Sequence, residues 1–245
     1  QHTAIQKLAS TFGTDIVIGA ISLEPQPEGS YPETHRYNSA FVYHPDGSEP
    51  GRYDKLHLVL FGEYVPFRYW HSLHWFYRWL NSITPWGQDG FEYSLTEGRE
   101  FDVFATHQRA GGRERRFGIT ICYEDVIPQV FRRFITDASG GKRVDFMLNI
   151  SNDGWFGHGS QQPQHLVNCA FRAIENRVGI ARAVNTCVSG FIAPDGGWYD
   201  IITPQPGRPL AGGAGHRTST ILIDPRVTFY SRHGDLFGAA CSLVG

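Results

Sequence analysis

The chain has 245 residues, a formal net charge of −2 and 41% hydrophobic residues. This length suits one large α/β domain with a sizeable core, and the near-neutral charge argues against a nucleic-acid partner. The four cysteines have neither CxxC pairing nor metal-ligand spacing, and the eleven histidines form no HExxH motif. We therefore predict no disulfide framework and no zinc site, although the sequence does not exclude a single disulfide bridge.

The apolar and turn-forming patterns predict α/β or α+β layers, in which helices cover the faces of β-sheets. In chain order, we expect a helix over residues 3–12, strands over 15–22, 37–43 and up to about 52–55, strands over 101–106 and 116–122, a helix over 127–137, a strand over 144–150, a helix over 163–178, and strands over 180–193 and 218–224. The run at 144–150 is almost continuously apolar, which is typical of a strand buried on both faces. The segment 163–178 repeats apolar residues at helical spacing.

Residues 61–91 depart from this alternation, because they contain eleven aromatic residues, including four of the six tryptophans. One interpretation is an aromatic mini-core under a long loop. The other is an amphipathic arm that contacts lipid or covers an apolar substrate, since Trp and Tyr favour the membrane interface. Composition alone leaves both open.

A candidate nucleophile, Cys122, ends an apolar, β-branched run, and the acidic residues Glu124 and Asp125 follow before a helical pattern opens at Pro128. A cysteine at a strand-to-helix turn has an exposed sulfur, and the backbone N–H groups of the turn favour the thiolate and can stabilise an oxyanion. The alternative is a small buried hydrophobic residue, because free cysteine is among the most buried residue types.

Lys55 follows a predicted strand, and Glu63 comes eight residues later. A lysine at the end of a strand can supply a fixed positive charge near a developing oxyanion, and a glutamate can orient it. Taken alone, such a lysine is more often a surface charge.

Five motifs follow one another along the chain: Tyr53-Asp-Lys-x-His-Leu-Val-x-Phe-Gly-Glu-Tyr-x-Pro66, Gly118-Ile-x-Ile-Cys-Tyr-Glu124, Asn152-Asp-Gly-Trp-Phe-Gly157, Gln164-His-Leu with Arg172-Ala-Ile-Glu175, and Arg182-Ala-Val-Asn-Thr186. In this order they resemble the carbon–nitrogen hydrolase (nitrilase) superfamily, over about residues 10–235. Within it, the Phe-Gly-Glu-Tyr-x-Pro block, the Trp-Phe-Gly block and the aromatic arm resemble the apolipoprotein N-acyltransferases more than the soluble amidases.

The resemblance implies an α-β-β-α sandwich, set on a bundle of membrane helices at the bacterial inner membrane and facing the periplasm. It assigns the nucleophile to Cys122, the catalytic lysine to Lys55 and a second essential glutamate to Glu63. Tyr123 and Glu124 match the residues after the nucleophile that are also required.

The implied chemistry is a transfer of an acyl chain from a phospholipid, through a thioester on the cysteine, to the N-terminal amine of a diacylglyceryl lipoprotein. It needs no metal or organic cofactor. The implied partners are the phospholipid, the lipoprotein and the membrane, which the arm at 61–91 contacts. Two alternatives stay open: a soluble nitrilase-like amidase that uses the same residues, and a catalytically dead module that binds lipid or peptide.

Two departures from the family pattern stand out. The family's general-base glutamate lies in a Pro-Glu motif on the first core strand, and nothing in this sequence matches it. We expect a hydrolase-like domain over 1–235 that is truncated at its N-terminus and inactive without this base, followed at 236–245 by the start of a transmembrane segment. Cys187 also stands where the family usually has glycine, and we expect only a local adjustment there.

Overall fold

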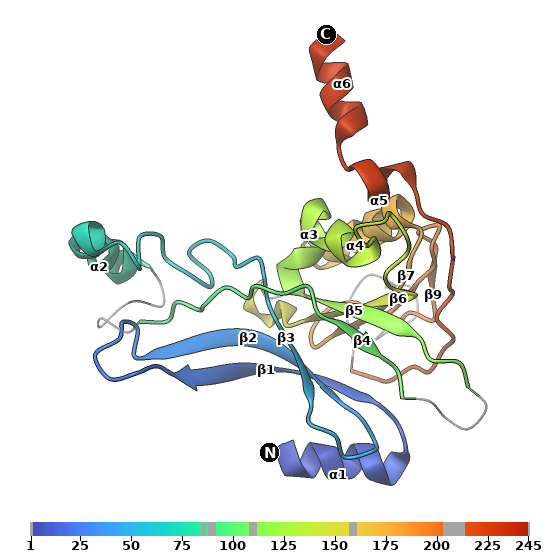
Figure 1. The fold of residues 1–245 in the computed structure, drawn as a ribbon, viewed down its shortest axis with the longest axis horizontal. Coiled ribbons are helices and arrows are strands. Elements are labelled where there is room, and N and C mark those ends of the chain that lie inside the picture. The colour runs from blue at the N-terminus through green and yellow to red at the C-terminus, as the bar shows by residue number, and fades with distance from the viewer. Residues whose placement is uncertain are drawn as a thin grey trace.

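The first β-sheet of the computed structural model has three antiparallel strands, in the order β1 (Ile16–Pro25), β2 (Thr34–Tyr43) and β3 (Gly51–Asp54). The structure describes residues 2–84, 87, 92–107, 112–156, 161–202 and 214–244. Helix α1 (His2–Phe12) packs against β2 on the outer side of this sheet (Figure 1).

The second sheet has six strands, in the order β4 (Val103–Ala105), β5 (Arg116–Ile121), β6 (Phe146–Ser151), β7 (Gly179–Val184), β8 (Gly190–Ile192) and β9 (Trp198–Tyr199). The central strands β5, β6 and β7 are parallel, and the outer strands pair antiparallel. The carboxyl ends of the three parallel strands therefore meet at one edge of the sheet, which is where side chains from distant parts of the sequence can converge.

Two helices, α3 (Pro128–Ile135) and α4 (Gln161–Asn176), cover the outer face of the second sheet (Figure 1). The two sheets face each other, so the layers run helix, sheet, sheet, helix. This α-β-β-α sandwich confirms the predicted fold class. Its core joins residues of both sheets and of α3, including a contact between the rings of Tyr53 and Phe134, whose centroids are 5.5 Å apart.

Most of the predicted elements are present within a few residues, but two strand predictions needed correction. The segment 180–193 is two strands, β7 and β8, because the Ser189 hydroxyl accepts the Val184 N–H at 2.9 Å and closes a turn between them. The predicted strand at 218–224 is wrong. There the Tyr199 hydroxyl donates to the Thr220 carbonyl and accepts the Leu222 N–H, so a side chain bonds backbone groups that a neighbouring strand would otherwise take.

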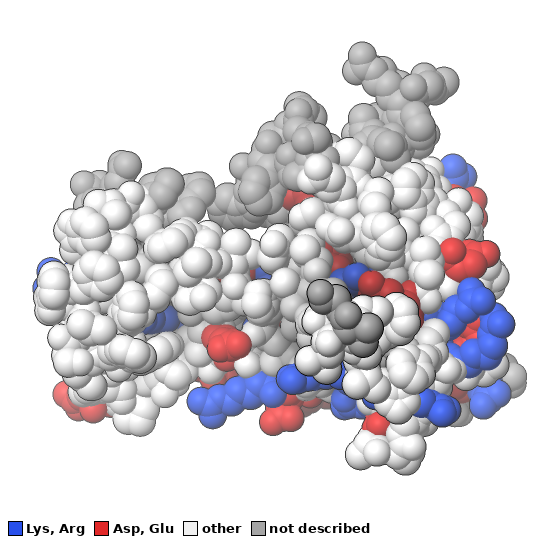
Figure 2. Space-filling model, turned by 90° about the horizontal axis from the view of Figure 1, so that it is seen from above, with Lys and Arg blue, Asp and Glu red and all other residues white. Residues whose placement is uncertain are grey.

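The aromatic segment forms an arm that ends in η1 (His71–Leu73) and α2 (His74–Ile83), far from the second sheet (Figure 1). Trp70, Trp75 and Trp79 are 60%, 70% and 53% exposed. The mini-core interpretation is therefore wrong for these three rings, whereas Tyr77 on the same helix is buried. Trp86 and Phe91 lie outside the described residues. This end of the molecule is mostly uncharged on the face seen in Figure 2.

The chain continues through α5 (Phe229–His233) into α6 (Leu236–Val244), which projects away from the sandwich (Figure 1). Leu236, Phe237 and Leu243 on α6 are exposed. Among the described residues, no helix combines the length and the apolar character that crossing a membrane requires.

Candidate active site

Cys122 lies directly after β5, at the first position of the short helix η3 (Cys122–Val126). Its φ of +53° is unusual for a residue other than glycine and costs on the order of 1–3 kcal/mol. This sharp turn ends the strand and lets the Cys122 side chain line a cavity between the two sheets. The position matches the predicted strand-to-helix turn.

Glu124, two residues later, is fully buried and connects this turn to the end of β3. Its carboxylate accepts the Ile121 N–H at 2.8 Å from β5, and the Tyr53 hydroxyl at 2.9 Å from β3. It also accepts the N–H groups of Leu56 at 2.7 Å and His57 at 3.1 Å, in the loop after β3. Four donor groups from two segments thus share one carboxylate.

The protonation of Glu124 reflects two opposing effects. Burial raises the pKa of its carboxyl group to about 7, while the backbone N–H donors and the Lys55 ammonium act in the opposite direction. Above this pH the group is a carboxylate and accepts from all four donors.

Lys55 lies in the loop that Glu124 holds, and its side chain is fully buried. Its ammonium donates to Glu63 Oε2 at 2.6 Å. The Glu63 carboxylate also accepts the Asn38 amide at 3.0 Å and the Val59 N–H at 2.9 Å. A buried ammonium needs such a partner, because an unpaired charge in the interior is strongly destabilising. The structure therefore brings Lys55 and Glu63 together as the sequence predicted.

The thiol of Cys122 experiences several charges of opposite sign. Burial raises its pKa, and the carboxylates of Asp153 and Glu63 act in the same direction, whereas the Lys55 ammonium and a hydrogen bond with Ser151 lower it. The thiol is therefore protonated at neutral pH and needs a base before it can act as a nucleophile.

The cavity has a volume of about 1600 Å³ and a mostly apolar lining. Glu63, Cys122 and Asn152 are among its polar lining residues, and apolar residues of β1, β6 and β7 form much of the rest. This volume exceeds the roughly 300–1,000 Å³ of a typical small-molecule pocket. It therefore has room for a long apolar chain next to the Cys122 thiol.

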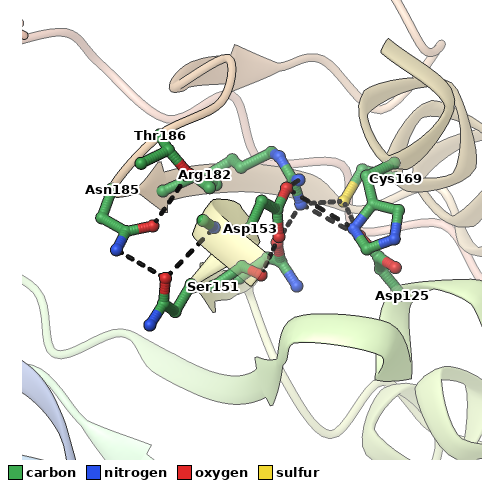
Figure 3. Close-up of polar contacts among 12 residues, drawn as sticks. Asp125, Ser151, Asp153, Cys169, Arg182, Asn185 and Thr186 are labelled. Atoms are coloured by element: carbon green, nitrogen blue, oxygen red, sulfur yellow. Dashed lines mark hydrogen bonds and ion pairs between the residues drawn. The ribbon is translucent and has the colours of Figure 1, made fainter. Parts of the chain in front are cut away.

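A second polar network lies behind the carboxyl ends of β6 and β7 (Figure 3). The guanidinium of Arg182, on β7, is buried and bonds Asp125 Oδ2 at 2.9 Å and Asp153 Oδ2 at 3.3 Å. It also donates to the Asn149 side chain. Ser151, the last residue of β6, donates its hydroxyl proton to Asp153 Oδ1. Sequence reasoning assigned no role to this network.

The predicted site residues occupy different positions relative to the cavity. Cys122 and Glu63 line it, and Lys55 and Glu124 lie behind its wall, both fully buried. Tyr123 is half exposed and is not among the lining residues, and its ring centroid lies 6.4 Å from that of His165. Lys55, Glu63, Cys122 and Glu124 are therefore grouped, whereas the Tyr123 side chain lies at the edge of the group.

Cys187, where the family usually has glycine, is buried and does not require a positive φ. A cysteine side chain therefore fits this position.

A family model of the carbon–nitrogen hydrolases matches residues 2–205. The chain belongs to the carbon–nitrogen hydrolase family. Solved structures of similar fold include an amidase from Nesterenkonia sp., with a TM-score of 0.53 and 19% identity over 84% of this chain and 63% of that one. Saccharomyces cerevisiae Nit3, a member of branch 10 of the nitrilase superfamily, has a TM-score of 0.51 and 18% identity over 82% of this chain and 59% of that one. At these identities the similarity concerns the fold alone.

Curated relatives of this carbon–nitrogen hydrolase are more similar in sequence. The apolipoprotein N-acyltransferase of Geobacter metallireducens is 32% identical over 97% of this chain and 39% of the relative. That of Rhodopseudomonas palustris is 35% identical over 75% of this chain and 30% of the relative. The chain thus spans less than two fifths of the length of either relative.

The role of Glu124 as a connection between two segments predicts a large loss of stability on truncation. Glu124→Ala leaves a buried hydroxyl, two buried N–H groups and the N–H of the exposed His57 without their acceptor, and we expect it to lower the free energy of unfolding by about 3–5 kcal/mol. Urea denaturation measures this, with Glu114→Ala, at an exposed glutamate, as a control that should change stability by less than about 0.5 kcal/mol. Equal, small effects of both substitutions would contradict the role given to Glu124.

Proposed function

We propose that this carbon–nitrogen hydrolase domain performs acyl transfer from a phospholipid to the N-terminal amine of a diacylglyceryl lipoprotein, through a thioester on Cys122. The observation that carries the proposal is the Cys122 thiol in a large apolar cavity, with the paired charges of Lys55 and Glu63 beside it. The names of the curated relatives support acyl transfer to a lipoprotein.

In the first half-reaction, a base takes the proton of the Cys122 thiol, and the thiolate attacks the carbonyl carbon of a phospholipid ester. The negative charge that develops on the carbonyl oxygen is stabilised by the Lys55 ammonium and by backbone N–H groups of the turn at 122–124. The bond to the glycerol oxygen then breaks, this oxygen takes up a proton, and the lysophospholipid leaves a thioester on Cys122.

In the second half-reaction, the amine of the lipoprotein attacks the thioester carbonyl and loses a proton to the base. The carbon–sulfur bond breaks, and the thiolate of Cys122 is regenerated with the acyl chain now in an amide. The base in this scheme is the family's Pro-Glu glutamate, which no residue of this sequence matches.

Residues 61–83 suit a place at a bilayer surface. Trp70, Trp75 and Trp79 are exposed along the arm, and the loop at its start also holds Lys55 against Glu63. Indole rings have an apolar body and a polar N–H, which favours the boundary between headgroups and acyl chains. We infer that the arm borders the entrance through which the lipid reaches the cavity, on the periplasmic side of the inner membrane.

The function is tested by following an acyl label in the complete gene product. Phospholipid labelled in its acyl chains is mixed with a peptide that begins with S-diacylglyceryl cysteine, and we expect the label in the amide of the peptide. Lys55→Ala should lower the rate of acyl-enzyme formation by about 10²–10³ with little change in phospholipid binding. Cys122→Ala should abolish transfer, and Cys241→Ser, at an exposed cysteine, should not. Label found only in free fatty acid would favour an amidase-like hydrolase instead.

The membrane role of the arm predicts that its tryptophans contact lipid. Vesicles of brominated phosphatidylcholine should quench the fluorescence of the protein, and replacing Trp70, Trp75 and Trp79 by Phe should remove most of this quenching. Trp198, exposed on β9 at the other end of the molecule (Figure 1), is the matched control, and Trp198→Phe should leave the quenching unchanged. Equal losses in both variants would show that lipid reaches the protein elsewhere.

A further inference from the structure

Ser151 and Cys122 occupy equivalent places at the carboxyl ends of two neighbouring parallel strands. Ile121 of β5 pairs with Ile150 of β6. Cys122 directly follows Ile121, and Ser151 directly follows Ile150. Both side chains line the same cavity. Backbone register, rather than proximity in the sequence, therefore places a hydroxyl next to the thiol.

The hydroxyl proton of Ser151 is bonded to Asp153 Oδ1. This carboxylate is almost fully buried and accepts from Arg182 Nη2 at 3.3 Å (Figure 3). His165 Nδ1 lies 3.6 Å from it. Arg182 is held in turn by Asp125 at 2.9 Å. A carboxylate paired with a buried guanidinium only accepts hydrogen bonds, so Ser151 must be the donor in its bond to Asp153.

A hydroxyl has one proton and two lone pairs. A hydrogen bond with Ser151 is among the effects that lower the pKa of the Cys122 thiol, and this effect requires the hydroxyl to donate to the sulfur. Because the hydroxyl of Ser151 donates its proton in a hydrogen bond to Asp153, the oxygen of Ser151 has only its lone pairs left for the thiol.

We propose that Asp153 is a positioning residue for the nucleophile, which fixes the Ser151 hydroxyl so that its oxygen accepts the S–H of Cys122. The inference rests on the proposed role of Cys122 as the nucleophile. It gives the network behind β6 and β7 a function: Arg182 holds Asp153, Asp153 holds Ser151, and Ser151 aims the thiol into the cavity.

This arrangement has a consequence for reactivity. After the base removes the thiol proton, Ser151 has no proton to donate to the thiolate. A thiolate without this donor keeps a high proton affinity, and the intrinsic nucleophilicity of a thiolate rises with the pKa of its thiol. Such a nucleophile suits an unactivated ester.

Other groups also affect the protonation of Cys122. The Lys55 ammonium approaches from the loop after β3, and the Glu63 carboxylate approaches from the cavity wall. Asp153 itself faces Arg182 of β7, His165 of α4 and the thiol of Cys187. A test must therefore change Ser151 and Asp153 while these charges stay in place.

The direction in which the pKa of Cys122 changes on substitution of Ser151 shows whether the Ser151 hydroxyl accepts a hydrogen bond from the thiol or donates one to it. Ser151→Ala removes an acceptor for the thiol proton, so we expect the pKa of Cys122 to fall, whereas loss of a donor to the thiolate would raise it. Ser151→Thr keeps the hydroxyl and should leave the pKa near that of the wild type. The pKa is read from the pH dependence of iodoacetamide alkylation, with Cys122 followed by peptide mass spectrometry.

Asp153→Asn provides the second arm of the test. Arg182 should keep bonding the amide oxygen, which turns the amide nitrogen to Ser151 and frees the serine proton for the sulfur. We expect the pKa of Cys122 to fall by about one to two units, the range for a hydrogen bond to a charged group, and to fall much less when Ser151→Ala is also present. Thermal unfolding of each variant checks the fold.

A rise in the pKa of Cys122 in Ser151→Ala would overturn the proposal, and this substitution alone decides it if Asp153→Asn does not fold. Equal shifts from Asp153→Asn with and without Ser151 would also overturn it, because the aspartate would then act by charge alone. These measurements read the thiol rather than turnover. A protein that fails to transfer acyl chains can still show the predicted shifts, so the two proposals fail separately.

Discussion

The carboxylate of Glu124 is the interaction on which the candidate active site depends. It accepts a hydroxyl from β3, two N–H groups from the loop that follows β3, and one N–H from the end of β5. The loop carries Lys55 and the turn after β5 carries Cys122. A buried carboxylate has a large desolvation cost, and here that cost is offset by four hydrogen bonds that join the two sheets at the point where the thiol lies.

The site also illustrates how charges can be buried next to an apolar cavity. Lys55 is paired with Glu63, and Arg182 is shared by Asp125 and Asp153. Glu63 also accepts the Asn38 amide and the Val59 N–H, and Arg182 also donates to the Asn149 side chain. The charges of Lys55, Glu63 and Asp153 act on the Cys122 thiol in a poorly solvated region, where electrostatic effects are stronger than in water.

Much of the fold could be predicted from the sequence, because apolar periodicity follows local structure. The helix at 163–178 and the buried strand at 144–150 are present nearly as expected. The strand-to-helix turn at Cys122 was visible because an apolar run stops there at acidic residues. The partnership of Lys55 and Glu63 could be predicted because both lie in one motif, eight residues apart.

The remaining features depend on contacts between distant segments. Asp125, Asp153 and Arg182 are brought together by the register of three parallel strands, which no local pattern encodes. The residues 218–224 have the composition of a strand, but their backbone bonds the Tyr199 side chain. Aromatic composition alone also could not show that Trp75 faces solvent while Tyr77 is buried.

The central claim is that Glu124 holds Lys55 in place relative to Cys122. It is tested most directly by a double-mutant cycle on the pKa of Cys122, measured from the pH dependence of its alkylation. Lys55→Met should raise this pKa by about one unit or more, because it removes a nearby positive charge. In a Glu124→Gln background, where the amide cannot accept from all four donors, the same substitution should raise the pKa by less than roughly half as much. Equal shifts in the two backgrounds would show that Lys55 and Cys122 are positioned without Glu124, and would contradict the account.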